Sequence, residues 1–190
     1  MCIFARKILK NMILIADGGS TKTDWALVEG KNIKTTFSTR GMNPYNVSEQ
    51  TMRKEIEEKV LPNTDVNSVY EIYIYASGCS AKVKQEEVVA WFKPYFPFAK
   101  ICVEGDLLGA ARATCGRSAA IAAILGTGSN SCLYDGENIV EYICMSKLEG
   151  FKDFLQICVA SSTFSKEVKS TDVVIILFPL KLKTLYLPNV

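Results

Sequence analysis

The sequence predicts an α/β protein that opens with an antiparallel meander and continues with parallel crossovers. Three short strand-like runs stand near the N-terminus and are separated by turns rich in glycine and polar residues. Segments with helical spacing then alternate with further strand-like runs, which is the pattern of crossover connections. From residue 118 a second series of three strand-like runs begins in the same way, although the two sequences are not alike.

The meander and the first helix follow from local patterns. The three strands are expected at Met12–Ala16, Trp25–Val28 and Ile33–Ser38. Ser48 is a suitable N-cap for a helix in which apolar residues recur every four positions, and Pro62 lies just past its end. The apolar stripe of this helix consists of Met52, Ile56 and Val60.

The crossover elements come next. Val69–Ala76 alternates at the strand period, and Ser80–Phe92 reads as a helix that ends before Pro94. A short strand at Lys100–Glu104 leads into a third helix, which Gly116 closes. The remaining expected elements are the helix Asp106–Cys115 and the strands Ala119–Leu125 and Asn130–Tyr134.

The organisation changes along the chain. We expect residues 12–117 to form a first lobe, residues 118–142 to begin a second, and residues 143–190 to be an unmatched tail. The tail has no glycine from Phe151 onward, and its one feature of note is a short β-prone run at Val173–Phe178. Met12 would be a natural start, so residues 1–11 read as an upstream extension.

Composition excludes several functions. The chain of 190 residues is 48% apolar and carries a net charge of only +2, so no basic field favours nucleic acid or a membrane surface. It contains no histidine, which leaves general-base chemistry to a carboxylate first. The seven cysteines form no C-x-x-C pair, which indicates a reducing cytoplasm. No apolar run approaches the roughly 20 residues that span a bilayer.

The strongest local motif is the turn-rich block from Asp17 to Asp24, which lies between two strands. Its small residues let backbone N–H groups approach an anion closely, and two hydroxyls and Lys22 add donors. It is not a Walker A loop, because that spacing is absent and no helix follows. The residues alone leave phosphate binding and a plain hairpin turn equally open.

Four further motifs allow two interpretations each. Gly126-Thr127-Gly128-Ser129-Asn130 is a glycine-rich turn between strands that could pair with the first loop to clamp a polyphosphate. Asp106 follows a strand and starts a helix, where an N-cap aspartate is the commoner role and a general base is the alternative. Gly41-Met42-Asn43-Pro44 and Ser77-Gly78 are either turns or contacts for a sugar.

Taken together, these blocks resemble a known family. In order and spacing they are similar to the N-acetylglucosamine kinase branch of the BadF/BadG/BcrA/BcrD ATPase family, within the sugar kinase/Hsp70/actin superfamily. The resemblance covers about residues 12–142 and rests on five separated blocks. It implies a ribonuclease-H-like (actin-like ATPase) first lobe plus an incomplete second lobe.

The resemblance also implies a site for each part of the reaction. Asp106 matches the catalytic base, and Asp17 matches the acid that helps to hold Mg²⁺ through water. The residues that match contacts to ATP phosphates are Gly18, Gly19, Ser20, Thr21, Lys22, Gly126, Thr127 and Gly128. Those that match sugar contacts are Asn43, Ser77, Gly78, Ser129 and Asn130. ATP, Mg²⁺ and an amino sugar are the expected ligands, and a homodimer is expected for full-length relatives.

The departures from the family define the alternatives. The Gly-Asp-Glu-Gly-Ser-type block and the glycine-rich adenosine contacts are absent, so we expect kinase activity to be impaired in this chain. The match to the family stops between Tyr142 and Cys144 and gives way to unrelated residues, which is typical of a frameshift or a mis-joined reading frame. A second hypothesis is an activator-type ATPase of the same family, although the cysteines lack the spacing of an iron–sulfur site. A third is a non-catalytic remnant or sugar-binding fragment.

Overall fold

The computed structural model describes residues 12–125, 129–143 and 173–177. The chain divides into two compact units, of which the first ends at Asp106 and the second begins at Leu107. The predicted order of three strands, a helix, a strand, a helix, a strand and a helix is confirmed for the first part of the chain.

The first unit contains a five-stranded mixed sheet in the order β3-β2-β1-β4-β5. Its strands are β1 (Met12–Gly18), β2 (Lys22–Glu29), β3 (Asn32–Arg40), β4 (Val69–Ala76) and β5 (Lys100–Gly105). The first three are antiparallel neighbours, whereas β4 and β5 join parallel to β1 and to each other. Because β1 is central, its apolar run is buried on both faces, while the edge strand β3 alternates between exposed and half-buried residues.

The first crossover is a continuous helical segment. It consists of α1 (Glu49–Glu55), the π-helical turn η1 (Ile56–Val60) and the 3₁₀ turn η2 (Leu61–Asn63). Ser48 caps it as predicted, since its hydroxyl accepts a hydrogen bond from the Thr51 N–H at 3.2 Å. The predicted apolar stripe is buried.

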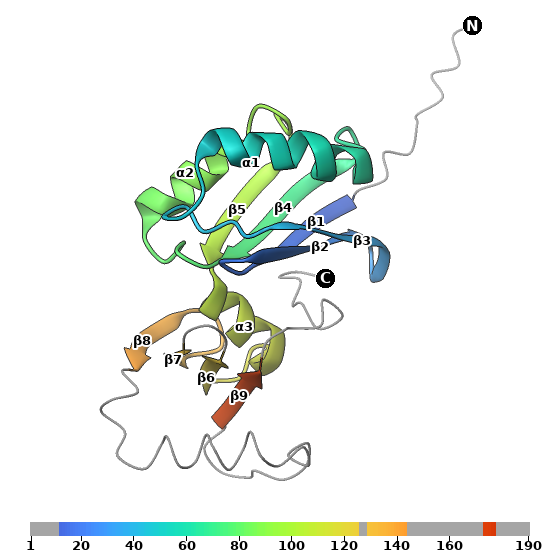
Figure 1. The fold of residues 1–190 in the computed structure, drawn as a ribbon. Helices are drawn as coiled ribbons and strands as arrows, with labels where there is room; N and C mark the ends of the chain where they lie inside the picture. The colour runs from blue at the N-terminus through green and yellow to red at the C-terminus, as the bar shows by residue number, and fades with distance from the viewer. Residues whose placement is uncertain (1–11, 126–128, 144–172, 178–190) are drawn as a thin grey trace, which may run out of the picture. The chain divides into compact units, whose positions relative to one another are not determined.

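The second crossover contains α2 (Lys82–Phe92), which begins two residues later than predicted because residues 77–80 form a turn. Figure 1 shows α1 and α2 lying over the same face of the sheet. Between them Trp25 stacks on Phe37, with ring centroids 5.9 Å apart, and also contacts Phe92. This aromatic group is the centre of the core that supports the sheet.

The second unit contains a four-stranded sheet in the order β8-β7-β6-β9. Its elements are α3 (Asp106–Cys115), β6 (Ala120–Leu125), β7 (Ser129–Tyr134), β8 (Ile139–Ile143) and β9 (Val173–Leu177). Apolar residues of α3, including Leu107 and Leu108, pack against Ala122 and Ile124 of β6. The apolar face of α3 thus belongs to the core of the second unit. The predicted end of the first lobe at residue 117 stays a prediction.

The second sheet contains one strand more than the three strand-like runs noted from residue 118. This strand, β9, pairs in parallel with β6, with Ile121 opposite Val173 and Leu125 opposite Leu177. The β-prone run at Val173–Phe178 accounts for this strand. No local pattern indicates that this strand pairs with β6, because parallel partners lie far apart in the sequence.

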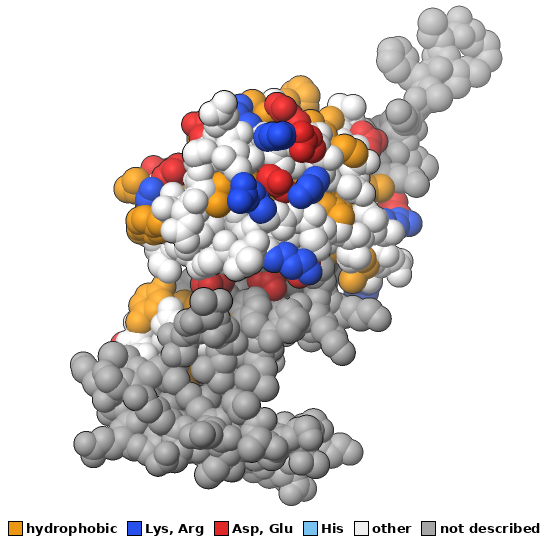
Figure 2. All heavy atoms as spheres, viewed as in Figure 1, with side chains coloured by type: hydrophobic (Ala, Val, Ile, Leu, Met, Phe, Trp, Pro, Cys, Tyr) orange, Lys and Arg blue, Asp and Glu red, His pale blue; other side chains and the backbone are white. Residues whose placement is uncertain are grey.

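The described surface is mixed in charge. Figure 2 shows acidic and basic side chains interspersed on the face that carries α1. Within the described ranges, no helix is long and apolar enough to cross a membrane.

Candidate active site

The loop between β1 and β2 is held to its neighbours through its carbonyl groups. The Ser77 N–H donates to the Gly18 carbonyl at 2.7 Å, and the Gly41 N–H donates to the Thr21 carbonyl at 2.9 Å. Within residues 12–125, no hydrogen-bond acceptor contacts the N–H groups of Ser20 and Thr21. The loop therefore turns carbonyls toward the protein and keeps backbone donors for another partner, as an anion-binding loop requires.

Two glycines allow the close approach of backbone segments around this loop. A Cβ at Gly41 would clash with the Ser20 carbonyl and would lie 2.6 Å from the Thr21 nitrogen. Gly78 has a φ of +81°, and a Cβ there would clash with Asn43 Oδ1. Neither position accepts a side chain without displacing a neighbour.

Three polar side chains from separate predicted blocks meet beside the loop. We call Ser20, Asn43 and Ser77 the Asn43 cluster. Asn43 Nδ2 lies 3.4 Å from both hydroxyl oxygens, which are themselves 3.3 Å apart. Asn43 Oδ1 accepts from the Tyr45 N–H at 3.0 Å, which fixes the amide orientation. The bonds within the cluster are long, so its donors can engage an external hydroxyl.

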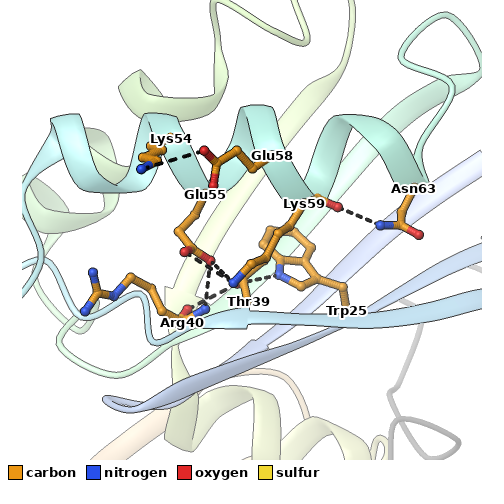
Figure 3. A network of polar contacts seen from close by, with 8 residues as sticks. All are labelled: Trp25, Thr39, Arg40, Lys54, Glu55, Glu58, Lys59 and Asn63. Carbon is orange, nitrogen blue, oxygen red and sulfur yellow. Dashed lines mark hydrogen bonds and ion pairs between the residues drawn. The ribbon is translucent and has the colours of Figure 1, made fainter.

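The segment that delivers Asn43 is anchored at the end of β3, as Figure 3 shows. Glu55 Oε2 accepts from the Arg40 N–H at 3.1 Å and lies 3.0 Å from Lys59 Nζ. Burial alone would raise the pKa of Glu55, but these two contacts bring it below its ordinary value. Glu55 thus ties α1 to the strand end from which the chain continues to Gly41.

Carboxylates gather under the loop. Asp17 lies on β1 opposite Asp24 of β2, and its side chain is only 6% exposed. Burial, together with the charges of Asp24 and Asp106, raises the pKa of Asp17 to about 7. Asp24 is held by Lys22 Nζ at 2.7 Å and by the Ser38 hydroxyl at 2.6 Å. Asp17 therefore sits in a negative field that a bound cation would relieve.

Asp106 is the first residue of α3, directly after β5. Its carboxylate therefore lies at the N-terminus of the helix, where negative charge is favoured. Gly105 packs against the turn of residues 77–80, since a Cβ there would lie 3.1 Å from Ser80 Oγ. Burial and the charge of Asp106 raise the pKa of Cys79 to about 12, which keeps that thiol protonated. Asp106 is thus within electrostatic reach of both Asp17 and the turn after Gly78.

The predicted site residues fall into four groups. Those in the first unit come together: Gly18, Gly19, Ser20, Thr21, Asn43, Ser77 and Gly78 surround one loop, with Asp17 and Asp106 nearby. Lys22, a predicted phosphate contact, is paired with Asp24. Gly126, Thr127 and Gly128 lie outside the described residues. Ser129 begins β7, and Asn130 Oδ1 accepts from the Ser131 N–H at 3.0 Å.

Sequence reasoning missed three residues in this region, Tyr45, Lys84 and Gln85. Lys84 Nζ lies 4.7 Å from the centroid of the Tyr45 ring, and Gln85 contacts the backbone of Cys79. Tyr45 stands two positions after Asn43, and this closeness in the sequence could have identified it as part of the site. Lys84 and Gln85 had none, because their positions in α2 look like an ordinary polar helix face.

Known structures share this architecture. A proposed N-acetylglucosamine kinase from Porphyromonas gingivalis is 41% identical over 70% of this chain and 47% of its own, with a TM-score of 0.66. The ROK hexokinase of Thermus thermophilus is 13% identical over 68% of this chain and 47% of its own, with a TM-score of 0.51. MreB5 of Spiroplasma citri bound to ADP is 9% identical over 71% of this chain and 52% of its own, with a TM-score of 0.52.

These similar structures establish the fold of the chain. The chain has the fold of the actin-like ATPases, as predicted, and it spans about half the length of the structures it matches. The predicted resemblance to N-acetylglucosamine kinases is also confirmed by the Porphyromonas gingivalis protein. No family model matches the chain, and no curated protein does, so the BadF/BadG/BcrA/BcrD family stays a prediction.

Proposed function

We propose that this chain carries the sugar and phosphate contacts of an ATP-dependent kinase for N-acetylglucosamine or a similar amino sugar. The convergence of the Asn43 cluster with the β1–β2 loop and the neighbouring carboxylates is the observation that carries this proposal. The 41% identity to a proposed N-acetylglucosamine kinase supports the choice of sugar.

The Asn43 cluster is the sugar-binding part of this proposal. The Asn43 amide donates through Nδ2, and Ser77 Oγ can donate or accept, so the pair matches sugar hydroxyls or an acetamido group. Gly78 lets the turn after β4 pack closely against this amide, because a Cβ there would clash with Asn43 Oδ1. Ser129 and Asn130 are proposed as further sugar contacts.

Asp106 is proposed as the base that takes the proton from the attacking sugar hydroxyl. A carboxylate that follows a strand and begins a helix is fixed by both elements, and phosphoryl transfer depends mainly on such positioning. General-base catalysis of this kind contributes a rate factor of about 10²–10⁴.

The β1–β2 loop is the proposed phosphate site, with N–H groups at Ser20 and Thr21 and the hydroxyl of Thr21 as donors. Asp17 fits a role in holding Mg²⁺, since it is a buried oxygen donor in a negative field. Mg²⁺ typically keeps several waters and binds one or two carboxylates plus substrate phosphates. When bound, it would neutralise phosphate charge. Gly126, Thr127 and Gly128 are proposed as the second phosphate loop.

Calorimetric titration of the chain with N-acetylglucosamine, and separately with ATP and Mg²⁺, tests this assignment. Asn43→Ala should weaken sugar binding by roughly tenfold, and Thr21→Ala should weaken ATP binding instead. Lys31→Ala, in the exposed turn between β2 and β3, is the control. Equal effects of both substitutions on both ligands would refute the division of roles, and no sugar binding by the parent chain would refute the function.

Location and assembly complete the proposal. We propose a cytoplasmic location, because the seven cysteines of the sequence form no C-x-x-C pair. We propose ATP and an amino sugar as partners, with neither nucleic acid nor a membrane, and a homodimer for longer relatives. The lobes are proposed at residues 12–117 and 118–142.

A further inference from the structure

One side chain of α2 reaches two segments of the candidate site. Gln85 is partly buried, and its Nε2 donates to the Cys79 carbonyl at 3.0 Å and to Glu104 Oε2 at 3.2 Å. An amide nitrogen has two N–H groups, so both donors of this side chain are used. The bond to Glu104 has a carboxylate acceptor, which makes it the stronger type.

The first of these segments is the turn that bears the proposed sugar contacts. Cys79 directly follows Gly78, and the Cys79 N–H donates to the Ala76 carbonyl at 3.1 Å. Ser77 is bound through its N–H to Gly18 and lies against Asn43. Any shift of the Cys79 carbonyl therefore moves the backbone that presents Ser77 and Gly78.

The second segment is the end of β5. Glu104 lies two residues before Asp106, with only Gly105 between them. Gly105 packs closely on Ser80, so the turn and the strand end are already in contact. Gln85 bonds to both sides of this contact and so sets the distance between them.

We propose that Gln85 is a positioning residue, which holds the Ser77–Gly78 turn in register with the strand end that carries Asp106. This inference rests on the proposed function for its purpose, but the mechanical link is independent of any sugar. Gln85 touches neither substrate nor Asp106 in this account and acts through Cys79 and Glu104.

Substitutions can separate the two bonds. Gln85→Ala removes both, while alanine keeps the helix propensity of this position. Gln85→Glu also removes both and sets a second carboxylate beside Glu104. The double substitution Gln85→Glu with Glu104→Gln restores a bond between the two side chains, with donor and acceptor exchanged, but leaves the Cys79 carbonyl without this donor.

Amide hydrogen exchange of the full 190-residue chain tests the link. Gln85→Ala should speed exchange at Ser77 and Cys79 by roughly tenfold, because about one hydrogen bond of local stability is lost. Exchange at Ile74 and Val103, in the adjoining strands, should not change. Glu86→Ala, on an exposed residue of the same helix turn, is the control and should leave all four amides unchanged.

In the double substitution, exchange at Cys79 should stay faster than in the parent chain. The bond between the side chains at positions 85 and 104 is restored, but the Cys79 carbonyl still lacks its donor. Unchanged exchange at Ser77 and Cys79 in Gln85→Ala, or an equal rise at all four amides, would overturn the proposal.

Titration with N-acetylglucosamine then separates this inference from the function. Gln85→Ala should raise the sugar Kd by roughly tenfold if the parent chain binds the sugar. Local exchange that rises while the sugar Kd stays at the parent value would overturn the positioning role. A parent chain that fails to bind the sugar refutes the proposed function, and exchange at Ser77 and Cys79 then still decides the link.

Discussion

The two units share a strand order but differ in how their strands are brought together. Three antiparallel strands and one parallel strand stand in the order β3-β2-β1-β4 in the first unit and β8-β7-β6-β9 in the second. In the first, a helix-containing crossover connects β3 to β4, and α1 and α2 cover one face. In the second, β9 comes from a distant part of the chain, and Val140 and Tyr142 of β8 are 61% and 52% exposed.

The connections that follow the strands of each hairpin decide which side chains reach the hairpin loop. Each sheet opens with two consecutive antiparallel strands, and glycines stand between them in the sequence: Gly19 between β1 and β2, and Gly126 and Gly128 between β6 and β7. In the first unit the crossover turns bring Asn43 and Ser77 to that loop. The site contacts described here therefore depend on short connections after β3 and β4.

The largest expected effect concerns Asp106, where the first unit ends. In any preparation that phosphorylates N-acetylglucosamine, Asp106→Asn should lower kcat by about 10²–10⁴, because asparagine is a far poorer base. The fold should persist, since asparagine suits the start of a helix. Steady-state kinetics and circular dichroism measure the two properties, and turnover near the parent rate would remove Asp106 from the base role.

A packing change in the first unit should come next. Gly41→Ala forces a methyl group into the Ser20–Thr21 backbone and should lower the free energy of unfolding by about 1–3 kcal/mol. Trp25 and Trp91 both lie in this unit, so tryptophan fluorescence during urea unfolding reports on it selectively.

Gly30→Ala is the control for this change, because nothing lies within 4 Å of the added Cβ, although its φ of +59° brings strain of its own. A smaller loss for Gly41→Ala than for Gly30→Ala would contradict the close packing of the loop.

The sequence predicts those features that depend on neighbouring residues better than those that depend on residues distant in the sequence. Ser48, Met52 and Ile56 specify a helix through neighbours three or four positions away, and the structure confirms it. The pKa of Asp17 and the position of β9 depend on residues that only the fold brings close. Gln85 belongs to this second kind, since its partners Cys79 and Glu104 lie on two other segments.

A pH effect should separate the first unit from the second. Asp17 has a pKa of about 7 in the folded chain, above its value of 3.8 when unperturbed. The stability from this group is full below about pH 4 and is lost as the pH rises through about 7. Asp17→Asn should therefore raise the urea midpoint at pH 8 and change it little at pH 4. Tryptophan fluorescence is the measurement, and Glu86→Gln is the control. An equal shift at both pH values would contradict the burial of an ionisable Asp17.

The smallest effect is expected in the second unit. The Tyr134 hydroxyl donates to the Gly116 carbonyl at 2.9 Å and links β7 to the end of α3. Tyr134→Phe should cost about 0.5–1.5 kcal/mol in the stability of this unit. Amide exchange of β6 and β7 measures this cost, while the tryptophan signal of the first unit should not move. A shift of the tryptophan transition would show that the two units unfold together.

Residue-resolved NMR titration of the chain with N-acetylglucosamine tests whether the Asn43 cluster binds the sugar. The amides of Asn43, Tyr45, Ser77 and Gly78 should shift on addition of sugar, and Asn43→Ala should weaken the response. Glucose, which lacks the acetamido group, should shift the same amides at higher concentration. An absence of shifts at these four amides, or shifts confined to other parts of the first unit, would contradict the claim that the Asn43 cluster binds the sugar.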